Sequence, residues 1–312
     1  MATLLVFQRN YADHTTPSGH PERSDRLRAV DEALSAEQFQ FLDRREAPMG
    51  DLSLAELVHA PGYVDALRQA RPAEGIAQID EDTFITAGSL EAVATGIGGA
   101  LLALDAVALG EVPNAFCAIR PPGHHAEVER PMGFCLVNTV AITAREAQRK
   151  YGAERVAIVD FDVHHGNGTE DIFRADPSVL YASSHQMPLY PGTGWPEFTG
   201  VGNIVNAALS GGSGTEEMRA AYTDRILPAI EAFKPDFLLI SAGFDADYRD
   251  PLAGLKWRPG DFAWVTNQLL ELADRHCDGR VVSLLEGGYD LEGLGQGVAA
   301  HVSALMGQSE ID

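Results

Sequence analysis

The stretch from residue 156 to residue 168 places three polar side chains at every second position. It begins as an apolar run, typical of a strand buried on both faces, and then carries Asp160, Asp162 and His164. Residues two apart in an extended chain point to the same side. Asp162 and His164 could therefore bind one metal ion, with Asp160 behind them as a hydrogen-bond acceptor. The same short motif also occurs at strand ends whose polar groups only hydrogen-bond to one another. Further residues are therefore needed to distinguish a metal site from such a strand end.

A third possible ligand follows another apolar run, at residues 237–242. Asp245 comes three residues after it and would complete an Asp/His/Asp set with Asp162 and His164. Three protein ligands leave one coordination position open, which is the arrangement of catalytic zinc. Taken by itself, Asp245 could instead cap a turn. Carboxylate and imidazole ligands accept Fe²⁺ as well as Zn²⁺, so the pattern is compatible with both ions.

Acid–base chemistry is indicated by two adjacent histidines, His124 and His125, which follow a Pro-Pro-Gly turn. Histidines held in a rigid turn can serve as a general base and an electrostatic partner if each ring has an acceptor that orients it. Asp160 could orient one ring and Asn167 the other. By themselves the two histidines could also be surface residues or additional metal ligands.

Three loop aromatics lie within two residues of a glycine: Phe134, Tyr190 and Tyr289. The hydroxyl of Tyr289 could donate to a developing oxyanion, and Phe134 and Tyr190 could form the walls of a narrow channel. Ordinary packing is the alternative for each. Together with the metal ligands and histidines, they describe metal-assisted hydrolysis of an amide, in which a histidine moves a proton from water to the leaving amine.

An α/β fold would bring these loops together. Apolar runs predict a first strand at 3–8 and five more that end in Gly-containing loops with His, Asp or Tyr, at 114–119, 156–163, 179–184, 237–242 and 281–285. Helical patterns occur at 22–34, 54–59, 63–71, 89–109, 139–151, 216–233 and 261–276, and Thr169 could cap another helix. In a parallel sheet the ligand site lies beyond the carboxyl ends of the strands, so the loops should converge there. No linker interrupts the pattern, and we expect a single domain over residues 1–312.

The composition limits the partners. The 312 residues include 45 Asp and Glu against 23 Lys and Arg, a formal charge of −22 that argues against nucleic-acid binding. The charge suits a cationic substrate, although a solubilising surface explains it more simply. The three cysteines, Cys117, Cys135 and Cys277, form no C-x-x-C pair, which favours a reducing compartment.

We expect no membrane partner. The apolar run at residues 4–7 is too short for a signal peptide, and Glu91 and Asp105 interrupt the apolar helix at 89–109. The sequence therefore predicts a soluble, cytoplasmic protein. An oligomer is compatible with it.

Six loop motifs occur together in one known family. They are Arg120-Pro-Pro-Gly-His-His125, Gly133-Phe-Cys135, Asp160-Phe-Asp-Val-His-His-Gly-Asn167, Tyr190-Pro-Gly-Thr-Gly194, Ser241-Ala-Gly-Phe-Asp245 and Glu286-Gly-Gly-Tyr289. In these motifs the chain resembles the histone deacetylase family, which includes bacterial acetylpolyamine amidohydrolases. The resemblance implies the arginase–deacetylase fold, a central parallel sheet of about eight strands with helices on both faces.

The resemblance also implies a set of catalytic roles. Zn²⁺ would be held by Asp162, His164 and Asp245. The catalytic residues would be His124, His125 (the general base), Tyr289 (which polarises the acyl carbonyl), Asp160 and Asn167. The tunnel for the acyl-lysine chain would be lined by Gly133, Phe134 and Tyr190.

Two K⁺ sites are implied in the same way. The first would be formed by Asp160, Asp162, His164, Ser183 and Ser184, partly through backbone oxygens. The second would lie near Phe173, Asp176 and Val179.

Some residues distinguish branches of the family. Asn167 and Glu286 stand where class I members carry Asp and Gly, which places the chain nearer class II and suggests a bacterial source. Tyr190 replaces the common Phe, so the tunnel would be more polar. Asp82 would match a rim carboxylate that holds the substrate backbone. Leu252 stands where polyamine-selective relatives can carry Glu, and it offers no charge to a distal ammonium.

The implied reaction is removal of acetyl or other acyl groups from lysine side chains of peptides or proteins. An acetylated small amine, such as an acetylpolyamine, is the alternative substrate. Two alternatives come from other classes: a non-catalytic acetyl-lysine binder, and an arginase-like manganese hydrolase, which uses two metals and more carboxylates.

Overall fold

A parallel sheet runs through the centre of the computed structural model, which describes residues 2–308. Among these residues the sheet has eight strands in the order β2-β1-β5-β10-β9-β6-β7-β8, and its paired strands are parallel. The strands are β1 (Leu4–Phe7), β2 (Asp43–Glu46), β5 (Asn114–Ala118), β6 (Val156–Asp160), β7 (Val179–Gln186), β8 (Ile204–Leu209), β9 (Phe237–Ala242) and β10 (Val281–Leu285). Residue 1 and residues 309–312 of the expected 1–312 domain lie outside the described part.

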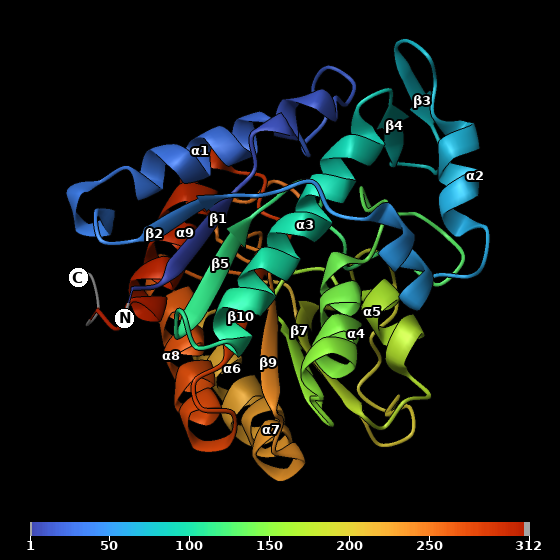
Figure 1. The fold of residues 1–312 in the computed structure, drawn as a ribbon. Coiled ribbons are helices and arrows are strands. Elements are labelled where there is room, and N and C mark those ends of the chain that lie inside the picture. Colours follow the sequence, from blue (N-terminus) through green and yellow to red (C-terminus); the bar gives the residue numbers. More distant parts are fainter. Residues whose placement is uncertain (1, 309–312) are drawn as a thin grey trace.

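Helices cover both faces of the sheet (Figure 1). In that view α3 and α4 lie in front of the strands and α8 and α9 behind them. The helices are α1 (Asp25–Leu34), α2 (Tyr63–Ala70), α3 (Ser89–Ala108), α4 (Thr139–Tyr151), α5 (Asn167–Phe173), α6 (Thr215–Ala221), α7 (Leu227–Phe233), α8 (Pro259–His276) and α9 (Leu291–Leu305). This α/β architecture confirms the predicted fold class.

The central strands are long apolar runs because each one contributes side chains to two hydrophobic cores, one on each face of the sheet. In β6, Ala157 and Val159 belong to the core on one face, whereas Val156 and Ile158 belong to the core on the other. Successive side chains of a strand point to opposite faces, so the residues of a strand covered on both sides are mostly apolar. In β6 the first polar side chain is that of Asp160, the last residue of the strand.

Helix α3 has the length and composition of a membrane span, and it is the one such helix among the described residues. However, 78% of its most apolar window is buried inside the protein. Its side chains share a core with those of α4 and the sheet, so α3 is a core helix.

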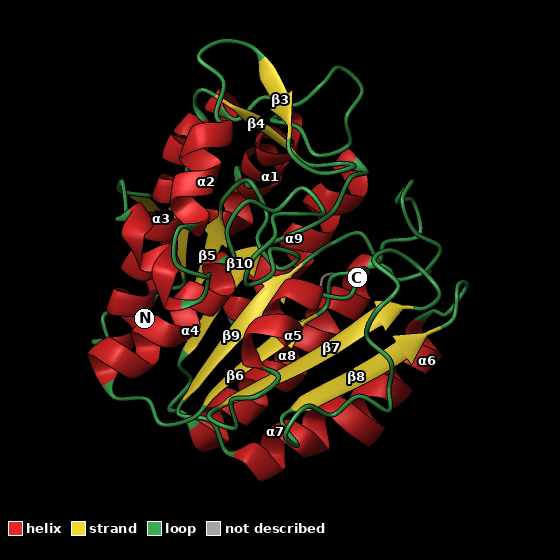
Figure 2. Cartoon of the chain, turned by 90° about the vertical axis from the view of Figure 1, so that its right-hand side faces the viewer, coloured by secondary structure: helices red, strands yellow, loops and turns green. Residues whose placement is uncertain are grey.

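The sequence missed the elements at the edges of the sheet. Strand β2 is polar and half exposed, and it pairs with β1 alone, so it lacks the apolar run of a central strand. Strand β8 forms the other edge, beside β7 (Figure 2). A separate antiparallel hairpin of β3 (Ile76–Gln78) and β4 (Phe84–Thr86) was also not predicted, and neither was α9.

Several predicted boundaries were wrong. Strand β6 ends at Asp160, so Asp162 and His164 lie in the loop beyond it. Helix α5 begins at Asn167, with Gly166 rather than Thr169 at its N-cap. The helix expected at 216–233 contains a π-helical segment between α6 and α7, next to Pro228, which has no N–H to donate. The short helix expected at 54–59 is a 3-10 segment at Leu52–Leu57.

Candidate metal centre and active site

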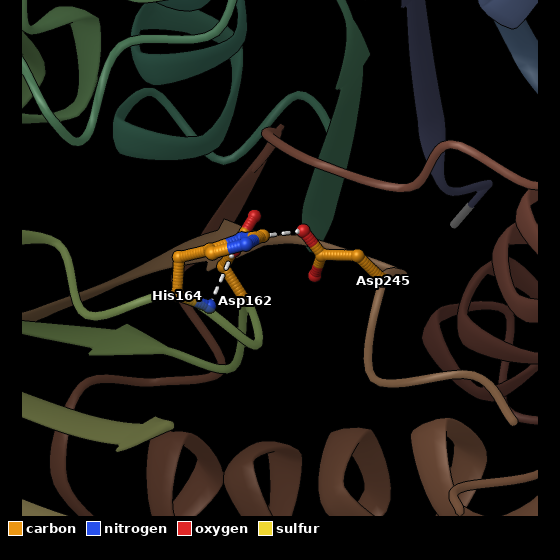
Figure 3. A group of neighbouring side chains, drawn as sticks. All are labelled: Asp162, His164 and Asp245. Atoms are coloured by element: carbon orange, nitrogen blue, oxygen red, sulfur yellow. Dashed lines mark hydrogen bonds and ion pairs between the residues drawn. The ribbon is translucent and has the colours of Figure 1, made fainter. Parts of the chain in front are cut away.

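Three possible metal ligands meet beyond the carboxyl ends of β6 and β9 (Figure 3). Ligand atoms of Asp162, His164 and Asp245 all lie within 4.8 Å of one another, and the three residues are buried. Nδ1 of His164 lies 3.2 Å from Oδ1 of Asp162 and 3.1 Å from Oδ2 of Asp245. The sequence prediction that these three residues come together is confirmed. We refer to them as the Asp/His/Asp trio.

The electrostatics of the trio favour a cation. Burial and the charge of Asp162 raise the pKa of Asp245 to about 7. Burial acts to lower the pKa of His164, but its hydrogen bonds to the two carboxylates raise it to about 10. The two buried carboxyl groups thus favour a positive charge between them. Two oxygens and one imidazole nitrogen also form a donor set that suits Zn²⁺ or Fe²⁺.

Glycines allow the backbone to approach the trio closely. A Cβ atom at Gly243 would collide with the Asp162 carboxylate, and one at Gly287 would collide with the carboxylates of Asp162 and Asp245. The N–H of Gly287 donates to Oδ2 of Asp162 at 2.8 Å, and the N–H of Val163 donates to Oδ1 of Asp245 at 2.8 Å. These backbone bonds orient the carboxylates toward His164.

The two adjacent histidines have separate acceptors. Nδ1 of His124 lies 2.9 Å from Oδ2 of Asp160, and Nδ1 of His125 lies 2.7 Å from Oδ1 of Asn167. Burial acts to lower the pKa of His124, but the charges of Asp160 and Asp162 raise it to about 10. Burial and the charges of His124 and His164 hold the pKa of His125 well below its usual value. The pair therefore divides into one cationic and one neutral ring.

A pocket adjoins the metal ligands and the histidine pair. It has a volume of about 220 Å³ and reaches His164 of the trio. Its lining residues are Asp82, His125, Gly133, Phe134, His164, Leu189, Tyr190, Leu252 and Tyr289. The structure thus brings together every residue that the sequence suggested for a substrate channel, and adds Leu189. Leu189 was missed because a single leucine in a loop carries no signal.

Aromatic rings form part of the pocket wall. The rings of His125 and Tyr190 pack edge to face with centroids 5.3 Å apart, as do those of Phe134 and Tyr289 at 5.7 Å. Asp82 is half buried, and its Oδ1 accepts from the N–H of Gly133 at 3.1 Å.

Tyr289 is held by residues that the sequence did not reveal. Its N–H donates to Oδ2 of Asp250 at 2.7 Å. The guanidinium of Arg26 lies 5.0 Å from its ring centroid, and Nε of Arg26 donates to the carbonyl of Gly288 at 2.7 Å. Burial raises the pKa of Tyr289 well above its usual value, so the phenol stays protonated and can donate.

Glu286 holds the backbone of the turn that carries His124 and His125. Its Oε2 accepts from the N–H groups of Gly123 at 2.7 Å and His124 at 3.2 Å. Burial raises the pKa of this carboxyl to about 7. Arg120, at the start of the same turn, donates to both carboxylate oxygens of buried Glu22 at 2.6 and 2.7 Å.

Two of the residues suggested for the first K⁺ are neighbours in the sheet. Asp160 and Ser183 are register partners on β6 and β7, and both are buried. Oγ of Ser183 lies 2.9 Å from Nδ1 of His185, and Oγ of Ser184 lies 3.0 Å from the hydroxyl of Tyr222. The second K⁺ was expected near Phe173, Asp176 and Val179, and the backbone carbonyls of these three residues also converge.

Comparison with known proteins agrees with the geometry. The histone deacetylase domain matches residues 20–305. A probable deacetylase of Archaeoglobus fulgidus is 40% identical, with 94% of this chain and 83% of that protein covered. Histone deacetylase 10, chloroplastic, of Oryza sativa subsp. japonica is 39% identical, with 94% of this chain and 71% of that protein covered.

A solved structure shows the same fold. The crystal structure of the HDA15 HD domain superposes with a TM-score of 0.93 at 35% sequence identity, covering 100% of this chain and 91% of that one. Fold, loop motifs and buried trio thus agree with the sequence matches. The chain belongs to the histone deacetylase family, and its domain is that of a deacetylase, a hydrolase.

Proposed function

We propose that this protein is a zinc-dependent deacetylase that removes acetyl or other acyl groups from lysine side chains. The observation that carries the proposal is that a pocket of about 220 Å³ reaches His164 of the Asp/His/Asp trio and is also lined by His125 and Tyr289. Zn²⁺ held by Asp162, His164 and Asp245 would supply Lewis acidity for the acyl carbonyl and the attacking water. Fe²⁺ could replace it in the cell.

His125 is the general base of the proposed reaction. Its Nδ1 faces the amide oxygen of Asn167, so the neutral ring carries its proton on Nδ1. Nε2 is then free to take a proton from water and to return it to the leaving amine. Asp160 holds His124 as the neighbouring cation, which stabilises negative charge that develops in the pocket.

Tyr289 is the oxyanion donor. Its hydroxyl is protonated and its side chain lines the pocket, while Asp250 accepts from its backbone N–H and Arg26 contacts its ring. A donor held in place before the reaction needs no reorganisation when the tetrahedral oxyanion forms.

The pocket favours an extended, uncharged chain with an acyl amide at its tip. Phe134, Tyr190, Leu189 and Leu252 give it largely apolar or aromatic walls, which suit the methylene groups of lysine. Asp82 at the rim is the one carboxylate in the lining, and we assign it to the substrate backbone. A peptide is therefore the preferred substrate class.

An acetylated small amine is the second candidate, and the formal charge of −22 favours it. A polyamine carries further ammonium groups, which an acidic surface attracts. We extend the proposal to one structural K⁺ at Asp160, Asp162, His164, Ser183 and Ser184. The cytoplasmic location stays a prediction.

Side-by-side kinetics test the substrate assignment. The zinc-loaded protein is given an acetyl-lysine peptide and acetylspermidine, and kcat/KM is measured for each. A higher value for the peptide supports the lysine deacetylase, whereas a higher value for acetylspermidine moves the assignment to small amines. Peptide binding without turnover of either compound would instead identify a non-catalytic acetyl-lysine binder.

A further inference from the structure

Three backbone carbonyls between α5 and β7 point at a single nitrogen atom. Nδ2 of Asn203 lies 2.8 Å from the carbonyl oxygen of Phe173, 2.9 Å from that of Asp176 and 2.8 Å from that of Val179. Asn203 immediately precedes β8 and is 3% exposed. We call the three oxygens the carbonyl cage.

The orientation of the Asn203 amide is fixed by its other end. Its Oδ1 accepts from the N–H of Val201 at 3.2 Å, so Nδ2 must face the cage. An amide has two N–H groups, and three acceptors therefore share two hydrogens. One uncharged side chain thus donates to all three carbonyls, and those of Phe173 and Asp176 also accept the N–H groups of Asp176 and Val179.

The neighbouring residues leave room for this side chain. Gly200 has a φ of +56°, and a Cβ atom there would lie 2.6 Å from the carbonyl oxygen of Arg174 and 2.8 Å from Oδ1 of Asn203. A larger residue at this position would push the amide out of place. The local backbone is thus built around Asn203.

Other side chains also stabilise the α5–β7 connection. The carboxylate of Asp176 accepts from Arg145 at 2.6 Å and from the hydroxyl of Ser178 at 2.6 Å. The guanidinium of Arg145 also lies 4.8 Å from the ring centroid of Phe173.

A ring of carbonyl oxygens is a typical ligand set for K⁺, and the sequence resemblance implied a second K⁺ here. The described contacts do not fit an ion at this place, because the amide nitrogen already occupies the point where the three oxygens converge. We propose that the Asn203 amide replaces the second K⁺ in this chain, and that the α5–β7 connection binds no monovalent cation. The N–H groups of the amide carry a partial positive charge and bind the carbonyl oxygens in place of the ion.

Removing the amide should create the ion site. In the Asn203→Ala variant the carbonyl cage loses the two N–H groups of the amide, and Tm falls by about 3–8 °C when the salt is choline chloride. KCl at equal ionic strength should restore at least half of this loss. The same change of salt should raise the Tm of the unmodified protein by less. Any K⁺ site at Asp160 and Ser183 is common to both proteins, so the additional rise in the variant reports on the carbonyl cage.

Asn206→Ala is the matched control. Asn206 is also a buried asparagine, in β8, but its Nδ2 donates to Glu170 at 2.7 Å and not to a carbonyl cage. This variant should lose stability equally in both salts. If Asn203→Ala responds to K⁺ no more than the unmodified protein does, the cage is not a cation site and the proposal is wrong.

Crystals of the unmodified protein give a test that does not depend on the variant. Rb⁺ scatters anomalously and substitutes for K⁺. Crystals grown in RbCl should show no anomalous peak among the carbonyls of Phe173, Asp176 and Val179, with Nδ2 of Asn203 at their centre. A peak there, with the amide turned away, would overturn the proposal.

Discussion

The side-chain amide of Asn167 bridges His125 and Glu127. Its Oδ1 lies 2.7 Å from Nδ1 of His125, and its Nδ2 donates to Oε1 of Glu127 at 2.7 Å. The carboxylate can only accept, so it determines which end of the amide faces the histidine. Glu127 thereby sets the tautomer of His125, although it does not line the pocket.

Loss of this carboxylate should slow the chemical step. In Glu127→Ala the Asn167 amide is free to turn its NH₂ group toward His125, which favours the tautomer with the proton on Nε2. We expect kcat to fall about 10-fold with little change in KM, since a misplaced proton impairs the base and not the pocket. Glu127→Gln retains an acceptor oxygen and should keep most of the activity. Equal kcat values for Glu127→Ala and the unmodified protein would remove Glu127 from this role.

Tyr289→Phe tests the oxyanion donor. The ring and its contacts with Arg26 and Phe134 are retained, so only the hydroxyl is lost. The expected result is a fall in kcat of about 10²–10³-fold with unchanged thermal stability. Steady-state kinetics on an acetyl-lysine peptide give the answer, and near-normal kcat would show that another group stabilises the oxyanion.

Asp245→Asn and His164→Ala test the metal centre directly. Each removes one member of the Asp/His/Asp trio, so metal analysis should find little zinc in either variant. A ligand that binds only the folded state raises its stability, so adding zinc should raise the Tm of the unmodified protein and not that of the variants. Full zinc occupancy in both variants would show that the ion binds elsewhere.

Leu252→Glu tests the basis of substrate choice. Leu252 lines the pocket, and a carboxylate there would face a distal ammonium of a bound acetylpolyamine. The ratio of kcat/KM for acetylspermidine to that for the peptide should rise about 10-fold, which corresponds to about 1.4 kcal/mol. Leu252→Gln adds a similar side chain without charge and should leave the ratio unchanged. If both variants behave alike, charge at this position does not select the substrate.

The residues that act in the proposed reaction could be predicted from the sequence because they directly follow apolar strands. Asp162, His164 and Asp245 lie a few residues past the ends of β6 and β9, and parallel strands bring such loops to one edge. The partners of His124 and His125 could be foreseen for the same reason, since Asp160 ends β6 and Asn167 opens α5.

The residues that hold these groups could not be predicted. Arg26 belongs to α1 and reaches Gly288 across the fold, and its only sequence signal is that of a charged residue on an amphipathic helix. Asp250 and Glu127 are loop carboxylates whose partners are set by tertiary packing. The same holds for Asn203, because the residues next to it in the sequence do not indicate that three carbonyls of the α5–β7 connection converge on its amide.

The central claim is that the Asp/His/Asp trio holds the ion that makes the protein a deacetylase. The direct measurement is turnover of an acetyl-lysine peptide by protein freed of metal with a chelator and then titrated with zinc. We predict no turnover without metal and full activity at one zinc ion per chain, blocked by a hydroxamate. Turnover by protein that contains no detectable metal would contradict the account, as would an inactive protein with one zinc ion bound at the trio.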